Sequence, residues 1–272
     1  MHRYRLIEYK AGATVEVIRC IPGLFRKGSM RSGPGKSKEE IKQANKNQAA
    51  RRLARKINAN FRPGDLHVIL TYRREERQEP KEAQKMISKF LKDLRKCYQK
   101  AGKLLKYILV TEYKKKAVHH HLIINNINDG NRTTQDYIRD GWKGRGSPKY
   151  VQLYDDGEYE QLAEYLIKET EETFREKNAP FRQRYSCSRN LIDPKAKQRT
   201  VKVKNGWELE PKPRSGYYIK KDSLYNGFDK MGYPYQRYLL VKECPEESDW
   251  PSDDWKPGNR KKRRKTRVHR GN

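Results

Sequence analysis

Residues 118–125 read VHHHLIIN, so that three of the six histidines of the chain stand inside an apolar run typical of a β-strand. Side chains alternate between the two faces of a strand. His119 and His121 should therefore share one face, while His120 points to the opposite, apolar face. The pair fits a metal site, a buried polar cluster or an RNA-binding surface, whereas His120 is more typical of a hydrogen-bonded core histidine.

A second apolar run, residues 104–113, precedes the histidines, and a short turn with three lysines separates the two. Such a pattern predicts an antiparallel hairpin. In that hairpin Glu112 would lie close to His119 and His121. An oxygen donor beside two imidazoles, with coordination positions left open, suits Mg²⁺ or Mn²⁺ that also contacts a phosphate. The alternative for Glu112 is an exposed carboxylate without a ligand.

The 272-residue chain is strongly basic, because 63 Lys and Arg residues against 34 Asp and Glu residues give a formal net charge of +29. Such a surplus favours a polyanionic partner, first of all nucleic acid; the alternative is a solvated basic surface. No apolar run reaches the length of a membrane span and no signal core is recognisable, so we expect no membrane partner and a cytoplasmic location. The four cysteines lie far apart, which indicates neither a zinc cluster nor a disulfide framework.

The order of the expected elements indicates an α+β fold in which helices pack on an antiparallel sheet. Two short strands around Gly12 and a helix from Ser37, marked by the capping-box sequence SKEE, come first. Strand, helix, two strands, helix, strand and helix then follow at 65–74, 80–102, 104–113, 117–126, 133–142, 149–154 and 158–174. Two weaker strand signals lie at 198–205 and 235–243.

We divide the chain into four parts. Residues 1–60 form an N-terminal basic segment of strands and a helix, and residues 61–192 form the core. Residues 193–245 form a small β-rich extension, and residues 246–272 form an acidic linker with a basic tail. The tail cannot build a core and should be disordered without a partner.

Cations are frequent on the wetter faces of the helix expected from Ser37. Arg51, Arg52 and Arg55 are among them, while residues from Ile41 onward form a rough apolar stripe. The basic face could follow DNA phosphates, or it could simply be solvated.

The helix expected at 158–174 places Tyr165 at the edge of its apolar stripe and Lys168 one turn further on. The hydroxyl could reach a groove while the ring lies against protein. Tyrosine is a poor nucleophile at its usual pKa of about 10, but a nearby cation or a metal-held phosphate would lower the barrier. Alone, the pattern fits an ordinary amphipathic helix equally well, with Lys168 paired to Glu164.

Three stretches in this order, VILTYRR (68–74), VHHHLI (118–123) and YLIK (165–168), resemble motifs one, two and three of the rolling-circle replication initiators, the HUH endonucleases. The chain is most similar to replication-associated proteins of bacterial phages and mobile elements, over roughly residues 57–191. The resemblance implies a five-stranded antiparallel sheet whose central strands carry the histidines.

The resemblance also implies roles for single residues. His119 and His121 match the metal-binding pair, and Glu112 matches the acidic third ligand, for Mg²⁺ or Mn²⁺. Tyr165 matches the nucleophile that attacks a DNA phosphate and stays attached to its 5′ end. Lys168 matches the lysine that positions metal or phosphate.

The first motif contributes Thr71, Tyr72 and Arg73, and its role in the family is structural or in DNA contact. Two positions depart from the family pattern. His120 occupies the middle of the histidine motif, where an apolar residue is usual. Tyr159 lies six residues before Tyr165, whereas the two-tyrosine subgroup has a spacing of four, which favours a single-tyrosine enzyme.

The expected function is metal-dependent, site-specific nicking of single-stranded DNA at a replication origin or origin hairpin, in the cytoplasm of a bacterial host. A host helicase and polymerase are candidate partners. One alternative is a non-catalytic nucleic-acid-binding protein whose tyrosines, among them Tyr217, Tyr218, Tyr233 and Tyr235, stack on bases or form a β core. Another is a transposase or relaxase of the same superfamily. A structural zinc protein is disfavoured, since no cysteine lies near the histidines.

Overall fold

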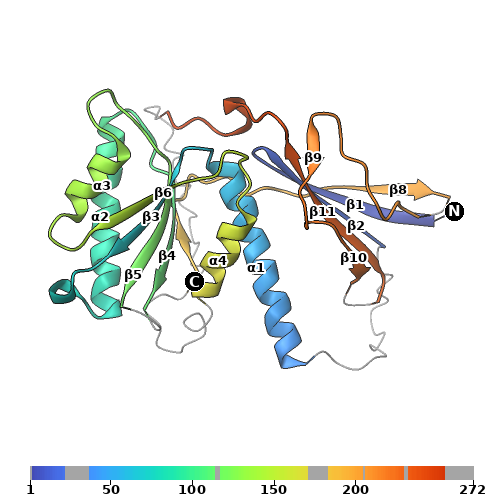
Figure 1. The fold of residues 1–272 in the computed structure, drawn as a ribbon, viewed down its shortest axis with the longest axis horizontal. Helices are drawn as coiled ribbons and strands as arrows, with labels where there is room; N and C mark the ends of the chain where they lie inside the picture. Colours follow the sequence, from blue (N-terminus) through green and yellow to red (C-terminus); the bar gives the residue numbers. More distant parts are fainter. Residues whose placement is uncertain are drawn as a thin grey trace, which may run out of the picture.

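The computed structural model describes residues 2–21, 37–113, 117–170, 183–204, 206–229 and 232–254. Within these residues the chain forms two antiparallel sheets and four α-helices, which confirms the α+β class (Figure 1). The basic tail, the loop before Ser37 and the end of the helix expected at 158–174 lie outside the described residues. No helix in the described ranges is long and apolar enough to cross a membrane.

The first sheet has five strands and is antiparallel throughout, as the sequence predicts. The strand order is β6-β3-β5-β4-β7, so the histidine strand β5 lies in the middle. The strands are β3 (Leu66–Thr71), β4 (Tyr107–Glu112), β5 (His119–Ile124), β6 (Pro148–Gln152) and β7 (Ser186–Cys187). β4 and β5 form the predicted hairpin, whereas the two-residue strand β7 has no sequence signal of its own.

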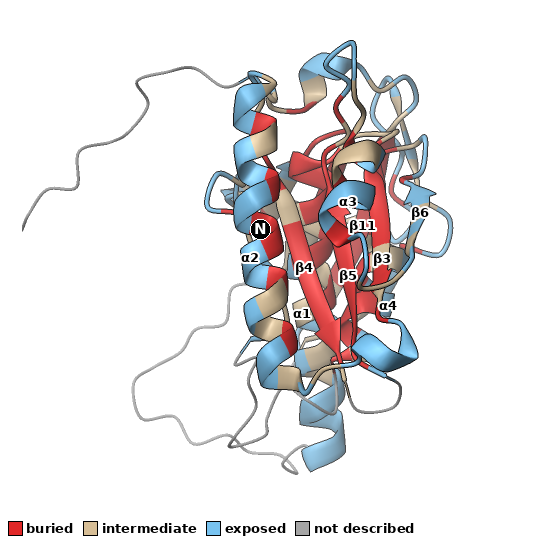
Figure 2. Ribbon diagram, turned by 90° about the vertical axis from the view of Figure 1, so that its left-hand side faces the viewer, coloured by how far each residue is buried: buried red, intermediate tan, exposed pale blue. Residues whose placement is uncertain are grey.

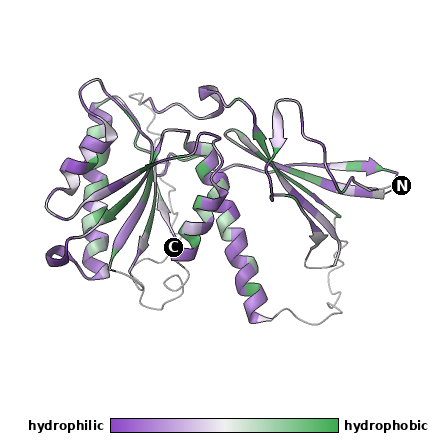
Figure 3. Cartoon of the chain, viewed as in Figure 1, coloured by the Kyte–Doolittle hydropathy of each residue, from purple (hydrophilic) through white to green (hydrophobic). Residues whose placement is uncertain are grey.

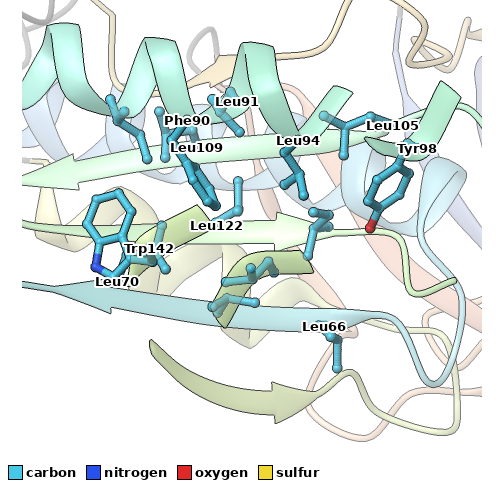
Figure 4. Close-up of a cluster of buried hydrophobic side chains, with 14 of the residues drawn as sticks. Leu66, Leu70, Phe90, Leu91, Leu94, Tyr98, Leu105, Leu109, Leu122 and Trp142 are labelled. Atoms are coloured by element: carbon cyan, nitrogen blue, oxygen red, sulfur yellow. The ribbon is translucent and has the colours of Figure 1, made fainter. Parts of the chain in front are cut away.

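One face of this sheet packs against α2 (Pro80–Lys100) and α3 (Thr134–Trp142). Proline begins α2, and its apolar residues at helical spacing turn a single stripe toward the strands. Figure 4 shows Phe90 and Leu94 of α2 above Leu109 and Leu122, and Figure 2 shows the buried strands beside this helix. Each such side chain stabilises the fold by roughly 1.5–3 kcal/mol, so this cluster holds the sheet in place.

The opposite face of the same sheet packs against α1 (Lys38–Asn60) and α4 (Glu160–Glu169). The buried side chains of this second cluster include Ile108, Val110, Ile123, Leu53, Ile57 and Leu166. The alternation predicted for the histidine strand is therefore confirmed, because Ile123 lies in this cluster while Leu122 and Ile124 lie in the cluster under α2.

The second sheet has six strands and joins the two ends of the chain. Leu6 of β1 is paired with Arg199 of β8, and Arg19 of β2 with Gln236 of β11. Its strands are β1 (His2–Ala11), β2 (Thr14–Cys20), β8 (Lys197–Val203), β9 (Tyr217–Ile219), β10 (Tyr225–Phe228) and β11 (Pro234–Lys242). The N-terminal segment and the β-rich extension, which the sequence treats separately, thus share one sheet. In Figure 1 this sheet lies on the far side of α1 and α4 from the five-stranded sheet.

α1 begins with the predicted capping box, in which the Ser37 side chain accepts from the backbone N–H of Glu40 and the Glu40 carboxylate accepts from the N–H of Ser37. Its burial starts only at Ala50. Ile41, expected in the apolar stripe, is 48% exposed, so that expectation is wrong. The first half of α1 extends beyond both sheets and is mostly hydrophilic (Figures 1 and 3).

Part of the segment expected to be an acidic linker is instead packed on the core. The Trp250 indole donates to the carbonyl of Asn58 at 2.8 Å, and the Lys106 ammonium lies 2.6 Å from the buried Asp253 carboxylate. A Cβ on Gly12 would stand 2.1 Å from the Asn58 carbonyl and 2.5 Å from the Trp250 ring nitrogen, and its φ is +56°. Only glycine fits there, so the turn between β1 and β2 is closed against α1 and Trp250.

Candidate active site

The face of the first sheet that turns toward α4 carries the paired histidines. Glu112 on β4 is the direct cross-strand partner of His119, and Val110 is the partner of His121. Directly opposed residues of an antiparallel pair share a face and lie side by side. The register therefore brings Glu112 to His119, as expected from the hairpin.

His119 and Glu112 are in direct contact. The Nε2 atom of His119 lies 3.2 Å from a carboxylate oxygen of Glu112, which is 1% exposed. The Nδ1 atom of His119 lies 2.9 Å from the carbonyl of Ala117, which can only accept, so Nδ1 carries a hydrogen. A neutral His119 would then turn the lone pair of Nε2 toward a carboxylate. Two acceptors in this position require a proton or a metal cation between them.

His121 contacts a histidine that sequence reasoning missed. Its Nδ1 atom lies 3.1 Å from Nε2 of His67, which is buried on β3. Burial lowers the pKa of His67 to about 4, so this ring is neutral at physiological pH. The contact fixes the orientation of the His121 ring, as outer hydrogen-bond partners of metal-binding histidines do. The sequence places His67 on a strand, but only the pairing of β3 with β5 brings it to His121.

Tyr165 projects from α4 toward the same histidine. The ring centroids of Tyr165 and His121 lie 5.3 Å apart with their planes at 89°, and the centroids of His119 and His121 lie 5.0 Å apart. Tyr165 is 40% exposed, so its hydroxyl is accessible while its ring leans on protein. Burial, followed by the charges of Glu169 and Glu112, raises the pKa of Tyr165. A cation at Glu112 would offset one of these causes.

Ion pairs that reach the second sheet hold the start of α4. Arg237 of β11 binds Glu160, the first residue of α4, and also the buried Glu16 of β2, which Arg55 of α1 contacts as well. Burial alone would raise the pKa of Glu16, but Arg237 and Arg55 outweigh it and lower that pKa. The helix that presents Tyr165 is thus anchored by residues from both ends of the chain.

Lys168 is exposed on α4, one turn beyond Tyr165. In the described part of the chain it makes no ion pair with Glu164, the alternative left open by the sequence. Tyr159 is fully buried, and its hydroxyl donates to the carbonyl of Tyr154. Tyr159 is therefore inaccessible as a second nucleophile, in line with the single-tyrosine prediction.

His120, on the opposite face, is a core histidine. It is fully buried, with Nε2 2.9 Å from the Tyr72 hydroxyl and Nδ1 2.8 Å from the Thr111 hydroxyl. Burial, then the nearby His119, lowers its pKa to about 3, so the ring is neutral. The two hydrogen bonds tie β3, β5 and β4 together at the level of the paired histidines.

The residues of the first motif have separate positions. Thr71 donates to the carbonyl of Ser147, and it is the cross-strand partner of His119. Tyr72 is buried against Trp142, its ring centroid 5.2 Å away, and burial raises its pKa to about 12. Tyr72 is therefore in its structural role here, whereas Arg73 is exposed.

The arginines of α1 differ in the same way. Arg55 is held by Glu16 and stacks on Tyr9, its guanidinium carbon 3.6 Å from the ring centroid, so it joins α1 to the second sheet. Arg52 is exposed and lines a groove of about 570 Å³ together with Tyr185. Arg51 is half-buried, and its charge acts on Tyr235 of β11.

The fit of a metal ion to this site is partial. In the part of the chain that the structure describes, no three His, Cys, Asp or Glu side chains stand together in positions that could hold one ion. The donor chemistry of the His119–Glu112 pair nevertheless suits a divalent cation, because a nitrogen and a carboxylate oxygen face each other in a buried place. His121 lies on the same face as that pair.

Comparison with known proteins gives one match. Residues 65–172 match the model of a family of replication-associated proteins, described as the ORF2 type. A search of curated proteins and a search of solved structures each found no match. The matched range runs from the start of β3 to just past the end of α4, and supports a replication initiator type. It includes all the residues of the predicted nicking site: Glu112, His119, His121, Tyr165 and Lys168.

Proposed function

We propose that this protein is a replication initiator that nicks single-stranded DNA at one site and forms a covalent link through Tyr165. The observation that carries the proposal is the convergence on one sheet face of an accessible phenol, two imidazoles and a carboxylate from β4, β5 and α4. The family match over residues 65–172 supports a role in replication.

Tyr165 is the nucleophile in this proposal. Its oxygen forms a bond to the phosphorus of the scissile phosphodiester, and the bond from phosphorus to the 3′ oxygen breaks. The phenol proton leaves to solvent and the 3′ oxygen takes up a proton, which yields a 5′-phosphotyrosine and a free 3′ hydroxyl. The exposed ammonium of Lys168, on the same helix face, stabilises the charge that develops on the phosphate oxygens.

His119, Glu112 and His121 are the proposed ligands of a divalent cation, Mg²⁺ or Mn²⁺. When bound, such an ion polarises the phosphate and offsets its negative charge. The residues themselves contribute orientation: the carbonyl of Ala117 holds the ring of His119, and His67 holds that of His121.

Affinity for the DNA backbone is a separate property. The exposed first half of α1 and the basic C-terminal residues would supply sequence-independent, salt-dependent binding. Arg52 and Arg73, which are both exposed, are the described arginines that we expect to contact phosphates. Removing the C-terminal residues should flatten the salt dependence of binding more than it alters the choice of cleavage site.

The test uses the full chain with a pool of random single-stranded oligonucleotides and Mn²⁺. The wild type should give a covalent protein–DNA band, and peptide mass spectrometry should place the nucleotide on Tyr165. Tyr165→Phe should abolish the band and keep oligonucleotide binding. The matched control is Tyr154→Phe, because Tyr154 is also exposed but lies outside the site.

Adducts that persist in Tyr165→Phe would contradict the assignment of the nucleophile. Binding without any adduct, in the wild type and with any divalent cation, would favour the non-catalytic nucleic-acid-binding alternative. A transposase or relaxase would give the same adduct and, in addition, join the cleaved strand to a second DNA molecule.

A further inference from the structure

A cavity of about 360 Å³ lies at the end of the six-stranded sheet that holds the N-terminus (Figure 1). Strands β1, β8, β10 and β11 and the residues after β8 surround it. Its size falls in the range of small-ligand sites, about 300–1,000 Å³. The nicking site lies in the other sheet, so this cavity is not part of it.

Aromatic side chains dominate the lining of this cavity. Tyr4 and Trp207 meet edge to face with ring centroids 5.2 Å apart, and Tyr235 lines another part of the wall. Tyr235 is half-buried and meets Tyr225 with centroids 6.1 Å apart. Such rings form walls against which a flat heterocycle can stack.

Large apolar side chains are exposed around the same end of the sheet. Leu209 is 66% exposed and also lines the cavity, while Phe228 is 69% exposed and Tyr225 is 50% exposed on β10. Exposed apolar residues gathered at one place, rather than scattered singly, mark a binding surface.

The charges around the cavity favour an anionic ligand. Arg3 is the only charged residue among the described residues that line it. Arg5, Lys202 and Lys204 are exposed on the same strands or directly after them. None of these four cations is in an ion pair with another described residue.

We propose that this cavity binds an unpaired base of single-stranded DNA and that the six-stranded sheet is a second DNA-contact surface. Stacking on Tyr235, Trp207 and Tyr225 would hold the base, and Arg3 and its basic neighbours would hold the adjoining phosphates. A duplex cannot use such a site, because its bases are stacked on each other and only a single strand offers their faces. This surface goes beyond the nicking chemistry and does not depend on it.

Binding is measured by fluorescence anisotropy with labelled oligo(dT) in EDTA, so that no cleavage contributes. All proteins are full-length and carry Tyr165→Phe. Phe228→Ala and Tyr235→Ala are the test variants, and Tyr154→Ala is the control, an exposed tyrosine outside the cavity. A second probe of equal length has abasic sites in place of the bases and keeps the phosphate charge.

Tyr235→Ala should weaken oligo(dT) binding at least about fivefold, the effect of losing one stacked base. Phe228→Ala, which is exposed enough to leave folding intact, should weaken it in the same direction. Both variants should bind the abasic probe as the control does. Oligo(dT) should also quench the tryptophan fluorescence, and Trp207→Phe should remove that quenching.

Three results would overturn the proposal. One is unchanged oligo(dT) affinity in both test variants. Another is an equal loss for the abasic probe or for a duplex, which would indicate a surface that contacts only the backbone. The third is a change of oligomeric state in Phe228→Ala by sedimentation, with DNA affinity unaltered, which would identify a contact between copies of this chain.

Discussion

Replacing His120 by leucine tests whether this histidine is a structural clamp. The side chain is fully buried and joins the hydroxyls of Tyr72 and Thr111 across three strands. Leucine is similar in size, so the change removes both hydrogen bonds without opening a large cavity. It also restores the apolar residue that the resembling family usually has at this position.

The expected cost follows from the two hydroxyls that lose their partner. Tyr72 is 7% exposed and Thr111 is 6% exposed, so water cannot readily replace His120. An unsatisfied buried polar group costs about 1–3 kcal/mol. His120→Leu should therefore lower the free energy of unfolding by about 2–6 kcal/mol. Adding Tyr72→Phe and Thr111→Val removes the two stranded hydroxyls and should recover most of that loss.

The assay is urea unfolding of the single and triple variants, followed by circular dichroism, with the free energy extrapolated to zero urea. A loss of less than about 1 kcal/mol in His120→Leu would refute the reasoning, since it would mean that the hydroxyls find other partners. A triple variant no more stable than the single one would refute it as well, because the cost would then lie in packing.

Three further predictions concern stability and the metal. Trp250→Ala should lower the free energy of unfolding by about 3–5 kcal/mol in the same assay, because the indole fills the junction between Gly12 and Asn58; a loss below about 1 kcal/mol would contradict this. Burial raises the pKa of Asp65 from 3.8 to about 7, so the native state binds this proton more tightly than the unfolded chain does. Its contribution to stability should be lost as pH rises from about 4 to about 7, by up to about 1.4 kcal/mol per unit, measured as the difference between wild type and Asp65→Asn; a difference independent of pH would contradict it. After EDTA treatment, Mn²⁺ at about 100 times its dissociation constant should stabilise the wild type by about 2.7 kcal/mol in thermal melts, and Glu112→Gln should lose this effect; an equal shift in both would exclude Glu112 as a ligand.

Local sequence patterns predicted the elements of the five-stranded sheet well. The apolar stripe of α2, the capping box of α1 and the alternation around the histidines each depend on neighbours within one or two turns or a few strand positions. The short strands β7, β9 and β10 escaped prediction, because their pairing partners rather than their own residues make them strands. Ile41 was misassigned since helical periodicity shows which residues share a face, but not whether anything covers it.

For the candidate site, the sequence indicated the donors but not their surroundings. Glu112 could be expected near His119 because one short hairpin carries both. His67 could not be assigned to His121, since that contact depends on the register of β3 against β5. Nor could Arg55 be recognised as structural, because its partners Glu16 and Tyr9 come from the other sheet.

By itself, then, the sequence determined the α+β class, the antiparallel hairpin and the face on which the paired histidines lie. These follow from strand alternation and helical periodicity, which act over a few residues. Only the tertiary structure decided that both ends of the chain build one sheet, that Arg237 and Glu16 anchor the helix of Tyr165, and that an aromatic cavity lies at the far end. Such contacts join residues distant in sequence, and their positions depend on how whole elements pack, which no local pattern encodes.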